Sequence, residues 1–168
     1  MTDEGEALLV TGLYGSGKTT LVEELAEQLE RRGLPYAAID VDWLGWFDVP
    51  GEPDLVAVGN ANLGFVLEQY WSKGVRYILM ACAVEDEEEL LAIRQLVPCG
   101  MRVLRLETPM ELIRARLVDA PTTGRAVDLA EAEREHRTSR LGAGRPDTVW
   151  PTTCDQAAER VLEWLGWP

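Results

Sequence analysis

The sequence predicts an α/β fold in which a parallel five-stranded sheet is covered by helices on both faces. Apolar runs alternate with segments of helical spacing. The runs are continuously apolar, as in strands that are buried on both faces. A chain of 168 residues has the length of one domain with a single core, so we expect residues 1–168 to form one domain of three α/β/α layers. The expected strands are Ala7 to Thr11, Tyr36 to Asp40, Tyr77 to Ala83, Met101 to Leu106 and Thr148 to Trp150.

The helices between the first four strands differ in how clearly the sequence marks them. Apolar residues at helical spacing run from Leu21 to Leu29, and Gly33 is placed to end that helix. Glycines and prolines interrupt the stretch after the second strand, where we expect a loop and then a helix from about Leu55 to Trp71. The acidic run Glu85 to Glu89 places favourable charge at the start of a third helix.

Two later helices carry start signals. Thr108-Pro109-Met110-Glu111 and Thr153-Cys154-Asp155-Gln156 both have the capping-box arrangement, the first with proline at the first helical position. Apolar residues at helical spacing follow each box, at 112–117 and 157–165. These two boxes therefore predict the fourth helix and the last.

The segment between the first strand and the first helix has the sequence of a phosphate-binding loop. Residues 12–19 satisfy the pattern G-x-x-x-x-G-K-[ST]. The glycines let backbone N–H groups surround a triphosphate, and the following helix presents its positive end to the same anion. The lysine adds a mobile charge, and the threonine offers a hydroxyl to Mg²⁺. The predicted nucleotide-binding residues are Gly12, Leu13, Tyr14, Gly15, Ser16, Gly17, Lys18, Thr19 and Thr20.

Two carboxylates, Asp40 and Asp42, stand at the end of the second strand. Ligands bind at the carboxyl edge of parallel sheets, so both acids face the predicted nucleotide region. Phosphoryl transfer needs a metal ion near the γ-phosphate and a base or orienting group on the attacking hydroxyl, and neighbouring acids can divide these tasks. The alternative is that both are solvated turn aspartates.

Composition and charge exclude several classes of function. The net charge of −13 repels nucleic acids, so we expect no DNA or RNA partner. No apolar run is long enough for a membrane helix, and the acidic start of the chain lacks a secretory signal, so we expect a cytoplasmic protein without a membrane span. Cys82, Cys99 and Cys154 are odd in number and widely spaced, which predicts buried thiols rather than disulfides or a zinc site.

With these features the chain resembles the P-loop small-molecule kinases, which include shikimate, gluconate and adenylylsulfate kinases and the chloramphenicol phosphotransferase. The resemblance rests on residues 12–19, on Asp40-Val41-Asp42, and on Leu112-Ile-Arg-Ala-Arg-Leu117 followed by an arginine-containing segment. It implies the sheet order 2-3-1-4-5 and a mobile lid at about residues 118–141. It also implies that ATP, with Mg²⁺, donates its γ-phosphate to a hydroxyl.

The resemblance further implies roles for the loop and the two acids. Lys18 would hold the β- and γ-phosphates, and Thr19 would ligate Mg²⁺ together with Asp40. Asp40 or Asp42 would orient and deprotonate the acceptor, and we favour Asp42 as the base. Their division of labour is left open.

Two arginines match arginines of these kinases. Arg116 matches the one that packs against adenine, and Arg125 matches the lid arginine that closes on the phosphates; Arg114 could substitute for either. The chain departs from many P-loop ATPases at the third strand, where no acid ends the strand and Cys82 stands near that position. A mechanical ATPase is therefore disfavoured.

The region between Asp42 and Val75, where this fold builds its acceptor pocket, carries one basic residue, Lys73. Anionic acceptors usually need a clamp of bidentate arginines. We therefore expect a neutral or cationic small molecule, such as a sugar, a nucleoside or an antibiotic-like compound, possibly bound against Trp43 and Trp46.

Two alternatives stay open at this point. One is a nucleotide kinase whose acceptor clamp comes from Arg76 or Arg102. The other is a regulatory protein that binds a nucleotide without transferring phosphate. ATP is preferred over GTP because the chain has no N-K-x-D guanine signature, and the expected assembly is a monomer or a homodimer.

Overall fold

Five parallel strands form one sheet in the order β2-β3-β1-β4-β5. The strands pair in register, so that Asp40 of β2 lies beside Ala81 of β3 and Ala81 lies beside Val10 of β1. The α/β class and the strand order that the family resemblance implied are both confirmed. The strands are β1 (Glu6–Gly12), β2 (Tyr36–Asp40), β3 (Tyr77–Ala81), β4 (Gly100–Glu107) and β5 (Thr148–Pro151).

The structure is a computed structural model that describes residues 5–51, 54–118, 125–138, 147–151 and 157–168. The predicted cap at 153–156 and two parts of the predicted lid, 119–124 and 139–141, lie outside these ranges. Within the described ranges, every helix is too short or too polar to cross a lipid bilayer.

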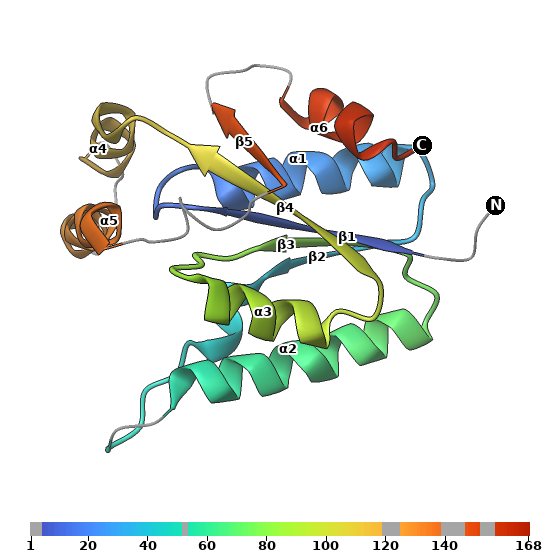
Figure 1. Cartoon of the computed structure of the whole chain (residues 1–168), viewed down its shortest axis with the longest axis horizontal. Helices are drawn as coiled ribbons and strands as arrows, with labels where there is room; N and C mark the ends of the chain where they lie inside the picture. The colour runs from blue at the N-terminus through green and yellow to red at the C-terminus, as the bar shows by residue number, and fades with distance from the viewer. Residues whose placement is uncertain (1–4, 52–53, 119–124, 139–146, 152–156) are drawn as a thin grey trace.

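Helices cover both faces of the sheet (Figure 1). On one face lie α1 and α6, on the other α2 and α3, while α4 and α5 stand beyond the carboxyl edge of β4. The helices are α1 (Lys18–Arg31), α2 (Leu55–Ser72), α3 (Glu87–Leu96), α4 (Met110–Val118), α5 (Arg125–Thr138) and α6 (Ala157–Leu165), and a 3₁₀ helix, η1 (Val41–Gly45), follows β2.

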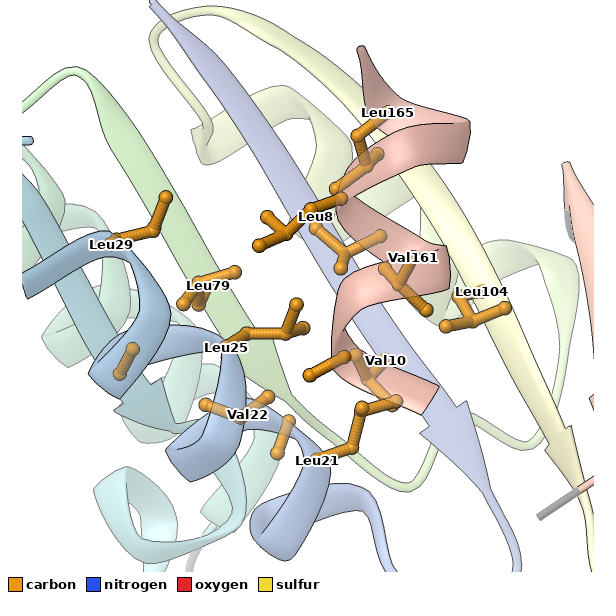
Figure 2. Close-up of a cluster of buried hydrophobic side chains, with 14 of the residues drawn as sticks. Leu8, Val10, Leu21, Val22, Leu25, Leu29, Leu79, Leu104, Val161 and Leu165 are labelled. Atoms are coloured by element: carbon orange, nitrogen blue, oxygen red, sulfur yellow. The ribbon is translucent and has the colours of Figure 1, made fainter. Parts of the chain in front are cut away.

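The core is divided by the sheet into two layers of buried side chains. Between the sheet and helices α1 and α6, aliphatic side chains interdigitate as Figure 2 shows. This layer includes Leu8 and Val10 of β1, Leu79 of β3, Leu104 of β4, Leu21, Val22, Leu25 and Leu29 of α1, and Val161 and Leu165 of α6. The second layer fills the space between the sheet and α2 and α3.

Two glycines explain why the stretch after β2 has weak periodicity. A side chain on Gly45 would meet the Leu55 carbonyl at 3.0 Å, and one on Gly59 would meet the Gly45 Cα at 3.4 Å. Asn62 also donates to the Leu44 carbonyl at 2.8 Å. The backbone of η1 therefore rests directly on α2, and the predicted helix from Leu55 is confirmed.

Several predicted element ends are confirmed, and the end of β3 differs. Gly33 has φ 66 just after α1, as a helix-ending glycine requires, and Asp86 caps α3 ahead of three acidic residues. By contrast, β3 ends at Ala81 rather than Ala83, because the Ala83 N–H donates to Asp42 instead of a strand neighbour. Thr108 donates its hydroxyl to the Ser16 carbonyl at 3.0 Å, so it also holds the loop after β1.

The fully buried Leu25 provides a test of the core layer between the sheet and helices α1 and α6. Leu25→Ala should lower the free energy of unfolding by about 2–5 kcal/mol, because it removes buried methyl groups and leaves a cavity. Urea unfolding followed by circular dichroism measures the change. Leu91→Ala is the matched control. Because Leu91 is 52% exposed, this variant should lose far less free energy of unfolding. Equal losses for the two variants would contradict this account of the core.

Candidate functional site

The loop between β1 and α1 has the backbone geometry that its glycines predicted. Gly12, Gly15 and Gly17 have φ values of 145, 75 and 102, a region that other residues rarely adopt. A side chain on Gly12 would also approach the Leu106 carbonyl to 2.7 Å. Gly15 packs against Ile113 and Leu117 of α4. The loop therefore curls tightly between β4 and α4 and delivers the chain into α1.

Lys18 and Ser16 occupy the interior of this loop. The Lys18 ammonium donates to the carbonyls of Gly12 and Leu13 at 3.0 and 3.2 Å, so it lies across the loop. The Ser16 hydroxyl is buried and has no hydrogen-bond partner among the described residues. A buried hydroxyl of this kind is costly unless a ligand or water completes its bonding.

Asp40 joins the end of β2 to the start of α1. The Thr19 hydroxyl donates to Asp40 Oδ2 at 2.9 Å. The second oxygen, Oδ1, is buried and has no partner in the described part of the chain. Burial raises the pKa of Asp40 above its ordinary value of 3.8, and the nearby charge of Asp42 adds to this, although the Thr19 hydrogen bond opposes it. The predicted pair of Thr19 and Asp40 is thus brought together.

Asp42 lies in η1 and is anchored to the segment after β3. Its Oδ1 accepts a hydrogen bond from the Ala83 N–H at 3.2 Å and one from the Cys82 thiol at 3.4 Å. Burial, followed by the charge of Asp42, raises the pKa of Cys82 well above its ordinary range, so the thiol stays protonated and acts as a donor. Cys82, just after the end of β3, therefore helps to orient an acid of η1, the 3₁₀ helix that follows β2.

A small cleft, open to solvent, lies between this segment and the loop after β1. Helix α5 closes one side of it: Arg134 pairs with Glu85 at 2.8 Å, and Glu135 accepts the Tyr14 N–H at 2.8 Å. Glu135 is only 8% exposed. The lining residues are Thr11, Gly12, Leu13, Ala83, Val84, Glu85, Arg105 and Glu135.

The predicted arginines have different surroundings. Arg116 donates to the carbonyls of Gly15 and Ser16 at 3.3 and 3.0 Å, so it supports the loop from α4. Arg114 forms an ion pair with Glu133 of α5. Arg125 begins α5, but its side chain lies outside the described part of the structure. Thr20 is exposed on the first turn of α1. A contact of Arg116 with adenine stays a prediction.

Trp43 and Trp46 stand next to Asp42 and are largely in solvent. Trp43 is 63% exposed and Trp46 is 72% exposed. Their rings lie 4.4 Å apart between centroids and are tilted by 42°. Because neither ring is buried in the core, both rings are accessible to a ligand.

Sequence reasoning missed the residues that reach this edge from distant elements. Arg105, Glu85 and Glu135 line the cleft. The one available signal was Arg105, a charged residue between Leu104 and Leu106 of β4. Glu135 gave no signal, because its partner Tyr14 is 121 residues away in the chain.

The residues present fit a magnesium-bound nucleotide. Mg²⁺ prefers oxygen ligands and is usually held by one or two carboxylates together with phosphate oxygens and water. Thr19 and Asp40 supply a hydroxyl and a buried carboxylate oxygen that lacks a partner among the described residues. No cluster of three or more histidine, cysteine or acidic ligands occurs in the described ranges, so a metal cage made of side chains alone is not formed there.

Comparisons with known proteins identify the fold. No family model and no curated protein matches the sequence. Among solved structures, a sugar kinase from Janibacter sp. HTCC2649 is similar over 96% of this chain and 95% of its own, with a TM-score of 0.72 and 22% identity. An APS kinase from Mycobacterium tuberculosis, in complex with AMPPNP and APS, is similar over 97% and 98%, with a TM-score of 0.65 and 17% identity.

A gluconokinase from Sinorhizobium meliloti 1021 also shares the fold, over 97% of each chain, with a TM-score of 0.64 and 16% identity. The chain therefore has the fold of the P-loop small-molecule kinases, as the sequence resemblance predicted. At these identities the likeness concerns the fold, while the site rests on the residues described above.

The raised pKa of Asp40 predicts a stability effect. The folded protein holds this proton more tightly than the unfolded chain, so the contribution of Asp40 to stability is fully present below about pH 3.8 and is lost as the pH rises through the raised pKa. Asp40→Asn, which is neutral at every pH, should raise Tm at pH 7 and remove this part of the pH dependence.

Thermal unfolding between pH 3.5 and 7 measures the effect of Asp40→Asn. The exposed Asp48, changed to Asn, is the control and should leave Tm nearly unchanged. An Asp40→Asn protein that is less stable than the wild type at pH 7, with the same pH profile, would contradict the prediction.

Proposed function

We propose that the protein is an ATP-dependent phosphotransferase that moves the γ-phosphate to a hydroxyl of a neutral or cationic small molecule. One observation carries the proposal: Asp40 is bonded to Thr19 of the phosphate-binding loop, and Asp42 is anchored to Ala83, at the wall of a cleft that begins at Gly12. The proposed phosphate site and the acid that would orient the acceptor would then lie on two sides of one cleft.

The nucleotide would bind along the loop. The backbone N–H groups of the loop and the start of α1 attract the phosphates, and Lys18 would turn from its carbonyl partners towards the β- and γ-phosphates. Thr19 and Asp40 would hold Mg²⁺, which when bound neutralises charge on the phosphates. Arg116 and Arg125 remain candidates for adenine and γ-phosphate contacts.

Asp42 would act on the acceptor. Two donors hold its Oδ1, while the side chain as a whole is exposed at the sheet edge. In the transfer step, the acceptor oxygen forms a bond to the γ-phosphorus as the bond to the β-phosphate oxygen breaks. The hydroxyl proton passes to Asp42, and ADP leaves.

The charge near the site supports a neutral or cationic acceptor. Lys73, the basic residue of segment 42–75, ends α2 and leads into β3, at the opposite edge of the sheet. Asp54 caps α2, and the two exposed tryptophans stand beside Asp42. An apolar wall next to a carboxylate suits a ring compound that carries an amine or no charge.

The nucleotide-kinase alternative loses its proposed clamp. Arg76 precedes β3 and lies over the Trp71 ring at 5.0 Å. Arg102, in the first half of β4, bonds to Glu6 at 2.9 Å and to the Trp164 carbonyl at 3.2 Å. Both arginines therefore stand at the amino edge of the sheet, away from the cleft.

Asp42→Asn separates an enzyme from a non-catalytic nucleotide-binding protein. The variant should lose phosphate transfer by about 10²- to 10⁴-fold, the usual contribution of a general base, while AMPPNP with Mg²⁺ binds as before. ADP release measures turnover, and isothermal titration calorimetry measures binding. Asp48→Asn is the exposed control and should keep full turnover. A wild-type protein that binds AMPPNP but transfers no phosphate would favour the regulatory alternative.

Matched acceptors test the expected charge. The first set is D-glucose, D-glucosamine and D-gluconate, and the second is adenosine and AMP. Each compound is assayed by ADP release, and the rate of an acceptor-free reaction is subtracted. Within each set that reacts, the neutral or amine-bearing member should have a kcat/KM at least about 10-fold above the anionic member, since one unpaired charge costs more than 1.4 kcal/mol. ATP consumption with the anionic members alone would refute this acceptor class.

A further inference from the structure

We propose that Arg105 is a specificity-determining residue that donates a hydrogen bond to a neutral oxygen, a hydroxyl or a carbonyl, of the acceptor. This inference rests on the proposed function and narrows its substrate class. Arg105 lies in the second half of β4 and lines the cleft between the loop after β1, the segment after β3 and α5.

The register of β4 places Arg105 where the core ends. Met101 and Val103 are buried in the layer beneath α2 and α3. Side chains two residues apart point to the same face of a strand, so Arg105 is the next residue on that face. An apolar residue there would extend the core, whereas Arg105 places a charged side chain at the lining of the cleft.

The guanidinium of Arg105 is incompletely bonded. Its Nη1 is buried and has no hydrogen-bond partner among the described residues. Arg102, on the same strand, offers the contrast: it pairs with Glu6, donates to the carbonyls of Trp164 and Leu165, and covers the Trp164 ring. A buried donor that lacks a partner destabilises the fold, and in a cleft it marks a place for a ligand acceptor atom.

The other charges of the cleft indicate a neutral partner. Two carboxylates, Glu85 and Glu135, line it together with Arg105. Glu85 pairs with Arg134, and Glu135 accepts the Tyr14 N–H. One arginine among two carboxylates does not make the cleft positive, so an anionic group gains little there. A hydroxyl or carbonyl oxygen completes the bonding of Nη1 without adding negative charge.

The cleft lies beside both the phosphate-binding loop and the segment that anchors Asp42. Gly12 and Leu13 of the phosphate-binding loop form one wall, and Ala83, which anchors Asp42, forms another. An acceptor with its reacting hydroxyl at Asp42 would therefore place a neighbouring oxygen at the cleft, where Arg105 is available as a donor.

Arg105→Met tests the inference, with Arg102→Met as the matched control. Without ligand, Arg105→Met should have a Tm equal to or above that of the wild type, because it removes a buried donor that has no partner among the described residues. Arg102→Met should lower Tm by about 2–4 °C or more, because its partners stay behind unpaired. A fall for Arg105→Met as large as for Arg102→Met would make Arg105 a structural residue and overturn the inference.

Kinetics provide the second measurement. With whichever of D-glucose, D-glucosamine or adenosine the wild type phosphorylates best, Arg105→Met should raise the acceptor KM by about 10- to 100-fold, the effect of one charge-assisted hydrogen bond. The AMPPNP Kd should change by less than about 2-fold. An unchanged acceptor KM, or weaker AMPPNP binding in its place, would overturn the inference. Absence of transfer by the wild type would instead overturn the proposed function, and this inference with it.

Discussion

The hydrogen bond from Thr19 to Asp40 is the contact on which the geometry of the site depends. It joins the first turn of α1 to the end of a strand that is not a direct neighbour of β1, since β3 lies between them. The bond forms because the parallel register brings Asp40, Ala81 and Val10 level with one another. Once Asp40 is fixed, η1 starts at Val41, and Asp42 reaches the segment after β3.

The incompletely bonded groups of the molecule gather at this same edge. In the described ranges, the buried side-chain polar atoms without a partner are Ser16 Oγ, Asp40 Oδ1 and Arg105 Nη1. They come from the phosphate-binding loop, β2 and β4, and all three lie towards the carboxyl ends of the strands. Folding alone does not favour such atoms, since each has lost water without gaining a partner. Their concentration at one edge is what a ligand site requires.

The sequence predicted the parts of the fold and site that depend on neighbouring residues. Continuous apolar runs identified the strands, and the glycine pattern identified the loop at 12–19. The sequence could not show the bonds that join distant elements, such as Glu135 to Tyr14 or Thr108 to Ser16. The predicted end of β3, at Ala83, is wrong for the same reason. The Ala83 N–H donates to Asp42, which lies 41 residues earlier in the chain.

The negative charge of the chain limits where an attraction for a polyphosphate could arise. A net charge of −13 opposes the approach of a polyphosphate, and two carboxylates line the cleft beside the loop. In the proposed function, the attraction would come from close, directed groups: the loop N–H groups, the start of α1 and Lys18. These act over a few ångströms, whereas the surface charge is screened beyond about 8 Å at physiological salt. Close groups also explain why Asp40 can stay partly buried beside the loop. Its negative charge is removed when the carboxylate is protonated, and it is offset by the hydrogen bond from the Thr19 hydroxyl or by a bound cation.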